Sequence, residues 1–197
     1  METVQISRRA KLRIGDPSIL TDPTSDLDGF EFKDLFWNPE DLIALMEDSH
    51  DAYKCVSEIQ PFGLHFGNTV SQTIRRIGTP SIAFTNKDCG QKHLCLLYKR
   101  KVQGINLCSQ LHFIHDRLFM VADHIERSKD QAETILTILT GKHNFTYTPM
   151  DTYDSSNQLI IDGNTNRMVI KMNSMLTLVF FSPYQYTLNA PTNGLRF

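Results

Sequence analysis

The residues that could do chemistry gather between positions 89 and 124. This stretch holds three cysteines and four histidines, which can bind metals or transfer protons: Cys89, His93, Cys95, Cys108, His112, His115 and His124. Spacings of four and three residues would place Cys108, His112 and His115 on one stripe of a helix. Thiolate and imidazole are ligands that zinc prefers, so these three residues are the candidate metal site, with zinc as the candidate cofactor. The spacing matches no zinc-finger pattern, and we favour the interpretation of a reduced core cysteine beside half-buried histidines.

The adjacent pair His115-Asp116 points to a second kind of metal chemistry. In that dipeptide the segment resembles the metal-dependent HD phosphohydrolases. Those enzymes are all-helical and take further histidine and aspartate ligands from other helices, whereas the flanking segments here have the pattern of strands. A metal-dependent enzyme that uses the Cys/His/Asp cluster is therefore our second alternative function.

Common catalytic signatures are absent from the sequence. It contains no Gly-x-Ser-x-Gly nucleophile elbow, no Gly-x-x-x-x-Gly-Lys phosphate loop and no Gly-x-Gly-x-x-Gly dinucleotide fingerprint. These absences argue against hydrolases of common folds, nucleotide hydrolases and dinucleotide enzymes. We therefore lean towards a non-catalytic protein that needs no cofactor.

Large apolar side chains near the N-terminus suggest how such a protein could act. Phe32, Phe36 and Trp37 lie close together, and Met46 follows on a predicted acidic helix. Such residues mostly belong to a core, but they also dominate protein interfaces when they are exposed. Our favoured hypothesis is an intracellular regulatory or assembly protein that binds another protein through Phe32, Phe36, Trp37 and Met46.

Basic residues in the middle of the chain support the first alternative, nucleic-acid binding. Arg75, Arg76, Lys99, Arg100 and Lys101 could track a phosphate backbone if the fold brought them together. The formal net charge of −2 and the pI of about 6.4 are unlike those of basic nucleic-acid-binding domains. Charges at strand ends also commonly protect a sheet edge from aggregation.

Composition indicates one globular domain in an intracellular protein. The 197 residues are 41% hydrophobic and 21% charged, which suits a single packed core. No apolar run approaches the roughly 20 residues of a membrane span, and the first residues contain no apolar signal region. Four irregularly spaced cysteines predict reduced thiols in the cytoplasm or nucleus. Turn dipeptides over 15–29 predict a basic arm and linker at 1–29, followed by one domain at 30–197. Partner identity and oligomeric state do not follow from these features.

The predicted elements give an α+β fold. Apolar residues at steps of three and four predict a long central helix over 107–139. A capping pattern at Ser128 leaves open whether this run is one continuous helix or two helices that meet near Arg127. Asn38-Pro39 predicts the start of an N-terminal helix that ends near residue 59. A short helix is expected over 70–77. Hairpins are expected at 81–102 and 158–172, followed by a strand over 175–181. The expected fold is an antiparallel sheet, made of the middle hairpin and the C-terminal strands, packed on the central and N-terminal helices.

Overall fold

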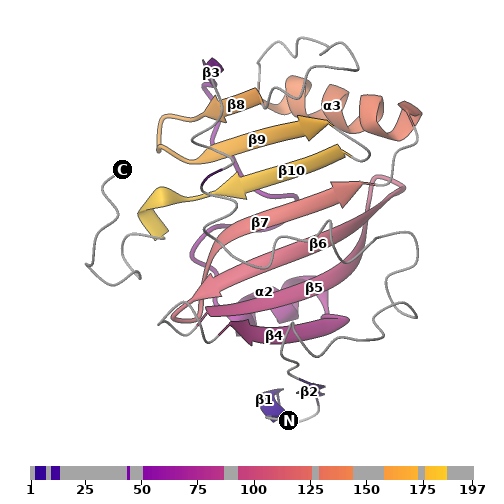
Figure 1. The fold of residues 1–197 in the computed structure, drawn as a ribbon, viewed down its shortest axis with the longest axis vertical. Coiled ribbons are helices and arrows are strands. Elements are labelled where there is room, and N and C mark those ends of the chain that lie inside the picture. The colour runs from indigo at the N-terminus through magenta and orange to yellow at the C-terminus, as the bar shows by residue number, and fades with distance from the viewer. Residues whose placement is uncertain are drawn as a thin grey trace.

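An eight-stranded mixed sheet forms the body of the fold (Figure 1). The computed structural model describes residues 3–7, 10–13, 44, 51–86, 93–125, 129–143, 158–172 and 176–185. The strands lie in the order β3-β8-β9-β10-β7-β6-β5-β4. Their bounds are β3 Asp51–Lys54, β4 Ile82–Asn86, β5 His93–Val102, β6 Ile105–Ile114, β7 Arg117–Ile125, β8 Gln158–Ile161, β9 Arg167–Met172 and β10 Leu176–Phe181. Neighbouring strands are antiparallel except for β3 and β8, which are parallel.

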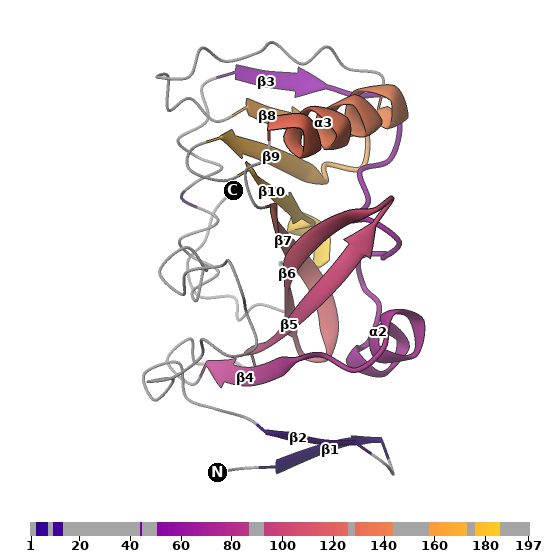
Figure 2. The same cartoon turned by 90° about the vertical axis from the view of Figure 1, so that its right-hand side faces the viewer.

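The sheet consists of two meanders that meet at its centre. Strands β4 to β7 follow one another through antiparallel pairs, and so do β8 to β10. The meanders join where β10 pairs with β7, from Leu176 opposite Ile125 to Phe181 opposite Met120. Helix α3 (Lys129–His143) connects the two halves. A separate two-stranded hairpin of β1 (Thr3–Ser7) and β2 (Ala10–Arg13) lies beside β4 (Figure 2).

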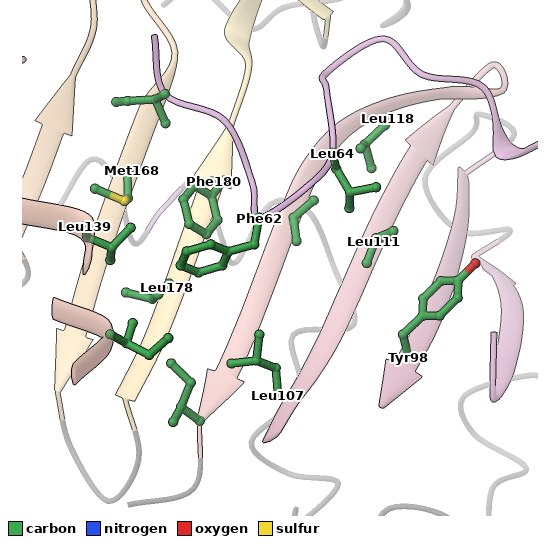
Figure 3. Close-up of a cluster of buried hydrophobic side chains, with 14 of the residues drawn as sticks. Phe62, Leu64, Tyr98, Leu107, Leu111, Leu118, Leu139, Met168, Leu178 and Phe180 are labelled. Carbon is green, nitrogen blue, oxygen red and sulfur yellow. The ribbon is translucent and has the colours of Figure 1, made fainter. Parts of the chain in front are cut away.

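Helices α2 (Val70–Ile77) and α3 lie on the same side of the sheet, which we call the helical face (Figure 2). Helix α2 begins with a complete capping box between Thr69 and Gln72 and ends at Gly78 with φ of 92°. The core of this face includes Leu111, Leu178, Phe180 and, from α3, Leu139 (Figure 3). Apolar burial between the helices and the sheet therefore supplies the main core.

The opposite side of the sheet, which we call the histidine face, is also buried. Alternation along β6 directs Leu107, Leu111 and Phe113 to the helical face and Cys108, Gln110 and His112 to the histidine face. A smaller apolar cluster on the histidine face includes Phe119, Met120, Val179 and Phe181. Because both faces are buried, nearly every residue of the central strands is inside the protein.

The predicted central helix over 107–139 is wrong. Residues 105–125 form the hairpin β6–β7, and among the described residues of this region the helix spans 129–143. Strands buried on both faces have near-continuous apolar runs without period-two alternation, and such runs contain many spacings of three and four. The turn between the strands has φ of 47° at His115 and 66° at Asp116, the positive values of a tight hairpin turn. The sequence places His-Asp where Asn-Gly is the usual signal, so this turn was missed.

The predicted N-terminal helix is also contradicted at its C-terminal end, where Asp51–Lys54 forms strand β3. Ala44 is helical, and the other residues from 38 to 50 lie outside the described residues. The fold is therefore mostly β, with one mixed sheet and short helices, rather than an α+β fold organised on a long helix. The two hairpins, the short helix over 70–77 and the strand that ends at Phe181 are confirmed.

Candidate functional site

The histidine face brings together two imidazoles from neighbouring strands. His93 of β5 and His112 of β6 stack with ring centroids 5.2 Å apart and 12° between the ring planes. His93 Nε2 and His112 Nδ1 are 3.0 Å apart, which is a hydrogen-bond distance. The ring of Phe119 packs edge-on against both imidazoles. The pair is thus fixed by sheet register, ring stacking and one hydrogen bond.

Cys95 extends this pair on the side away from His93. It lies directly opposite His112 in the β5–β6 register, and its Sγ is 4.0 Å from His112 Nε2. Only one of the two ring nitrogens that face each other can carry the proton. When His112 Nδ1 donates to His93, His112 Nε2 is free to accept from the Cys95 thiol; in the opposite arrangement His112 Nε2–H points at the sulfur. Both arrangements leave a neutral chain of three side chains.

A third buried imidazole lies one strand further into the sheet. His124 of β7 contacts Gln110 Oε1 through Nε2 at 2.9 Å and Thr177 Oγ1 through Nδ1 at 3.3 Å. Since the amide oxygen can only accept, Nε2 carries the proton and Nδ1 accepts from the hydroxyl. Both ring nitrogens of His124 are therefore bonded in its neutral form.

Burial holds these groups neutral at physiological pH. Desolvation lowers the pKa of His93 and of His124 to about 4. Burial, and then the two neighbouring histidines, lower the pKa of His112 well below its usual value. Burial raises the pKa of the Cys95 thiol, and it raises that of Cys108 to about 12. Because thiolate is the reactive form of cysteine, this environment suits packing and hydrogen bonding more than nucleophilic chemistry.

The structure does not bring the three predicted metal ligands together. Cys108 and His112 lie on the same face of β6 but four residues apart along a strand, about 13 Å. His115 is exposed in the β6–β7 turn. The helical spacing that united the three residues is lost because the segment is a strand. Among the described residues, no group of three or more His, Cys, Asp or Glu side chains could hold a metal ion.

The five basic residues proposed for nucleic-acid contact are divided between different parts of the surface and the core. Arg75 and Arg76 are exposed on α2, on the helical side of the sheet. Lys99 and Lys101 are exposed, and strand alternation places them on the opposite face. The side chain of Arg100 is only 9% exposed and is turned into the helical-face core. No single surface therefore carries all five.

Sequence reasoning missed a second buried polar cluster, on the helical face. Asp123 of β7 accepts a short hydrogen bond from Ser109, its direct partner on β6. Arg100 Nη1 lies 3.8 Å from Asp123 Oδ1, and Nη2 donates to the carbonyl of Phe62. Burial raises the pKa of Asp123, while Arg100 and the Ser109 hydrogen bond act in the opposite direction. The sequence feature that could have indicated this cluster is a charged residue, Asp123, inside an apolar run. The predicted helix over 107–139 instead places Asp123 on an exposed surface.

The residues of the favoured protein-binding hypothesis, Phe32, Phe36, Trp37 and Met46, lie outside the described residues. Among the described residues, three large apolar side chains are exposed: Tyr53 at 37%, Val56 at 93% and, after β10, Tyr184 at 62%. Tyr53 belongs to β3, at the edge of the sheet, and Val56 follows it directly. Exposed apolar area is thus found at the β3 edge.

Comparison with protein families, curated proteins and solved structures finds no match to this chain. In the part of the chain that the structure describes, no helix has the length and apolar character needed to cross a membrane.

Proposed function

We propose that this is a non-catalytic intracellular protein that acts by binding another protein, with the β3 edge as part of the contact surface. The observation that carries the proposal is the exposure of Val56 and Tyr53 beside an edge strand. Aromatic and aliphatic side chains that protrude from a surface are typical anchors of protein interfaces. No described strand pairs with the outer side of β3, so its backbone groups can also hydrogen-bond an added strand.

The distribution of reactive groups supports a binding role. His93, His112 and His124 are at most 1% exposed, and Cys95 is fully buried beside them. Their pKa shifts favour the neutral forms, and hydrogen bonds join His93 to His112 and His124 to Gln110 between neighbouring strands. These side chains therefore have structural roles in this proposal, and the protein needs no cofactor.

The aromatic segment predicted from sequence belongs to the same proposed surface. Met46 precedes β3 by only five residues, so the chain keeps it within about 18 Å of Asp51. We propose that Phe32, Phe36 and Trp37 act together with Val56 as anchors for the partner. An interface that combines apolar anchors with strand addition gives affinity and register at once.

Site-specific photocrosslinking in cells tests this proposal. A photoreactive residue replaces Val56 in one variant and Thr137 in the control, because Thr137 is exposed on a helix rather than on the sheet edge. We expect a discrete crosslinked protein from position 56 that is absent from position 137. Phe36→Ala or Trp37→Ala, introduced into the position-56 variant, should weaken this band while far-UV circular dichroism stays unchanged.

Two outcomes would contradict the proposal. Equal labelling at positions 56 and 137 would show that the β3 edge has no preferred partner. A crosslinked species that disappears on nuclease treatment would instead support nucleic-acid binding, and its loss on Arg75→Ala and Arg76→Ala would assign that contact to α2.

A further inference from the structure

The cluster around Arg100 and Asp123 is a buried ion pair whose hydrogen bonding is incomplete. Its three side chains come from three adjacent strands, with Arg100 on β5, Ser109 on β6 and Asp123 on β7. Asp123 is fully buried, and Arg100 is almost so. Ser109 donates to Asp123 Oδ1, and the carbonyl of Phe62 accepts from Arg100 Nη2.

Two polar atoms remain without a partner. In the described structure neither Arg100 Nη1 nor Asp123 Oδ2 makes a hydrogen bond. The 3.8 Å between Nη1 and Oδ1 allows electrostatic attraction but exceeds the length of a hydrogen bond. The residues on either side of Asp123 on this face of β7, Val121 and Ile125, are apolar, as is Leu178 opposite it on β10. These apolar neighbours cannot supply the missing donor and acceptor. The hydroxyl of Tyr98, which lies opposite Ser109 on β5, is also without a hydrogen-bond partner in the described structure and so does not pair with either atom.

We propose that this cluster is a binding site for one internal water molecule, which bridges Arg100 and Asp123. The water accepts a hydrogen bond from Nη1 and donates to the carboxylate, so that the donor and the acceptor left in the core are both bonded. Buried waters typically occupy such positions, where they make two to four bonds to groups that the protein leaves unpaired.

A crystal structure of the wild-type protein, at a resolution that shows ordered water, gives the direct test. We expect a well-ordered peak within hydrogen-bond distance of both Arg100 Nη1 and an Asp123 carboxylate oxygen. A direct bidentate contact between Arg100 and Asp123, with no peak between them, would overturn the proposal.

Magnetic relaxation dispersion of water tests the same site in solution, since it counts long-lived internal waters. The variant Arg100→Met/Asp123→Leu replaces the pair with apolar side chains of similar size, an exchange that buried ion pairs often tolerate. We expect this variant to hold one fewer internal water than wild type. The control Ser109→Ala keeps both bridging groups and should hold the wild-type number.

An equal number of internal waters in wild type and in the double variant would overturn the proposal. A lower number in Ser109→Ala alone would also overturn it. If the double variant does not fold, the wild-type crystal structure decides the question by itself.

Discussion

Three buried histidines of the sheet make the stability of the fold depend on pH. His93, His112 and His124 are buried in neutral form, with pKa values below that of an exposed imidazole. The unfolded chain therefore binds more protons than the folded one between the unfolded and folded pKa values. Their contribution to stability is complete above about pH 6.5 and is lost as the pH falls towards 4.

We predict that the free energy of unfolding decreases from about pH 7 to about pH 5. His93 and His124 should each contribute a slope of up to about 1.4 kcal/mol per pH unit, and His112 adds to it. Asp123 offsets part of this slope, because its raised pKa stabilises the folded state at low pH and that contribution is lost as the pH rises. Urea unfolding across this pH range measures the slope.

The variant His124→Gln should give a shallower pH dependence, because it removes one buried titrating group. His115→Gln is the control, since His115 is exposed in a turn, and it should keep the wild-type slope. A free energy of unfolding that stays constant between pH 7 and pH 5 would contradict the assignment of neutral buried imidazoles.

The cysteines of the sheet should react only slowly with thiol reagents in the native state. Cys95 and Cys108 are fully buried, and burial raises the pKa of both thiols. We predict that a thiol-alkylating reagent modifies them at least 100-fold more slowly in the native protein than in urea, because the reaction requires an accessible thiolate. Peptide mass spectrometry after timed alkylation measures each site. Rapid native labelling of Cys95 would show that the histidine face opens to solvent.

At the scale of elements, one carboxylate organises the turn between β8 and β9. Asp162 Oδ1 accepts hydrogen bonds from the backbone N–H groups of Asn164 and Asn166. Its Oδ2 accepts from the backbone N–H of Ile59 and from the side chain of Asn166. The turn is thereby tied to the segment that carries Ile59 into the helical-face core.

We predict that Asp162→Ala lowers the free energy of unfolding by about 2–4 kcal/mol. The variant leaves two buried backbone donors and the Asn166 amide without their acceptor. Chemical denaturation measures the loss. Asn164→Ala is the control, because it keeps the backbone bonds and removes an exposed side chain. Equal effects of the two substitutions would contradict the role given to the carboxylate.

The elements that could be predicted from sequence are those with local signals. Gly78 at the end of the short helix and the Gly163–Asn166 turn mark boundaries that the structure confirms. The hairpin β6–β7 could not be predicted, because burial of both faces removes alternation and the turn residue His115 is rarely found in that conformation. A long apolar run with internal polar residues therefore has the pattern of an amphipathic helical region.

The candidate site was predictable only in part, for a related reason. The density of cysteine and histidine drew attention to His112, but its contacts with His93 and Cys95 depend on the β5–β6 register. The pairing of Arg100 with Asp123 depends on three strands being adjacent, which no local pattern encodes. Site geometry in a sheet is set by pairing between strands, and sequence spacing describes it poorly.

On the scale of the whole molecule, the protection of backbone amides against hydrogen exchange is expected to vary across the sheet. Strands β7 and β10 lie at the centre, paired on both sides and buried on both faces. Strands β3 and β4 lie at the two ends of the strand order. Local opening is easier at sheet edges, which have fewer packed neighbours.

We predict that amide hydrogen exchange is slowest in β7 and β10 and at least 100-fold faster in β3. The central amides should exchange only through global unfolding, while those of β3 exchange through local fraying. Exchange measured by mass spectrometry on peptides that cover Asp51–Lys54 and Leu176–Phe181 gives the comparison. Equal protection of β3 and β10 would show that the β3 edge is covered in solution, which would also weaken the proposed interface there.

The pairing of β10 with β7 also determines how the chain can fold in time. Each meander closes through neighbouring segments, but the β7–β10 pairing joins residues that are 51 (Ile125 and Leu176) to 61 (Met120 and Phe181) positions apart in the sequence. Hairpins can therefore form early, whereas β7 and β10 can pair only after the long loop that contains α3 has closed. During that interval β7 and β10 are unpaired edges with apolar side chains on both sides. The risk of aggregation is therefore greatest during folding, when β7 and β10 are exposed, although the native protein buries both strands at its centre.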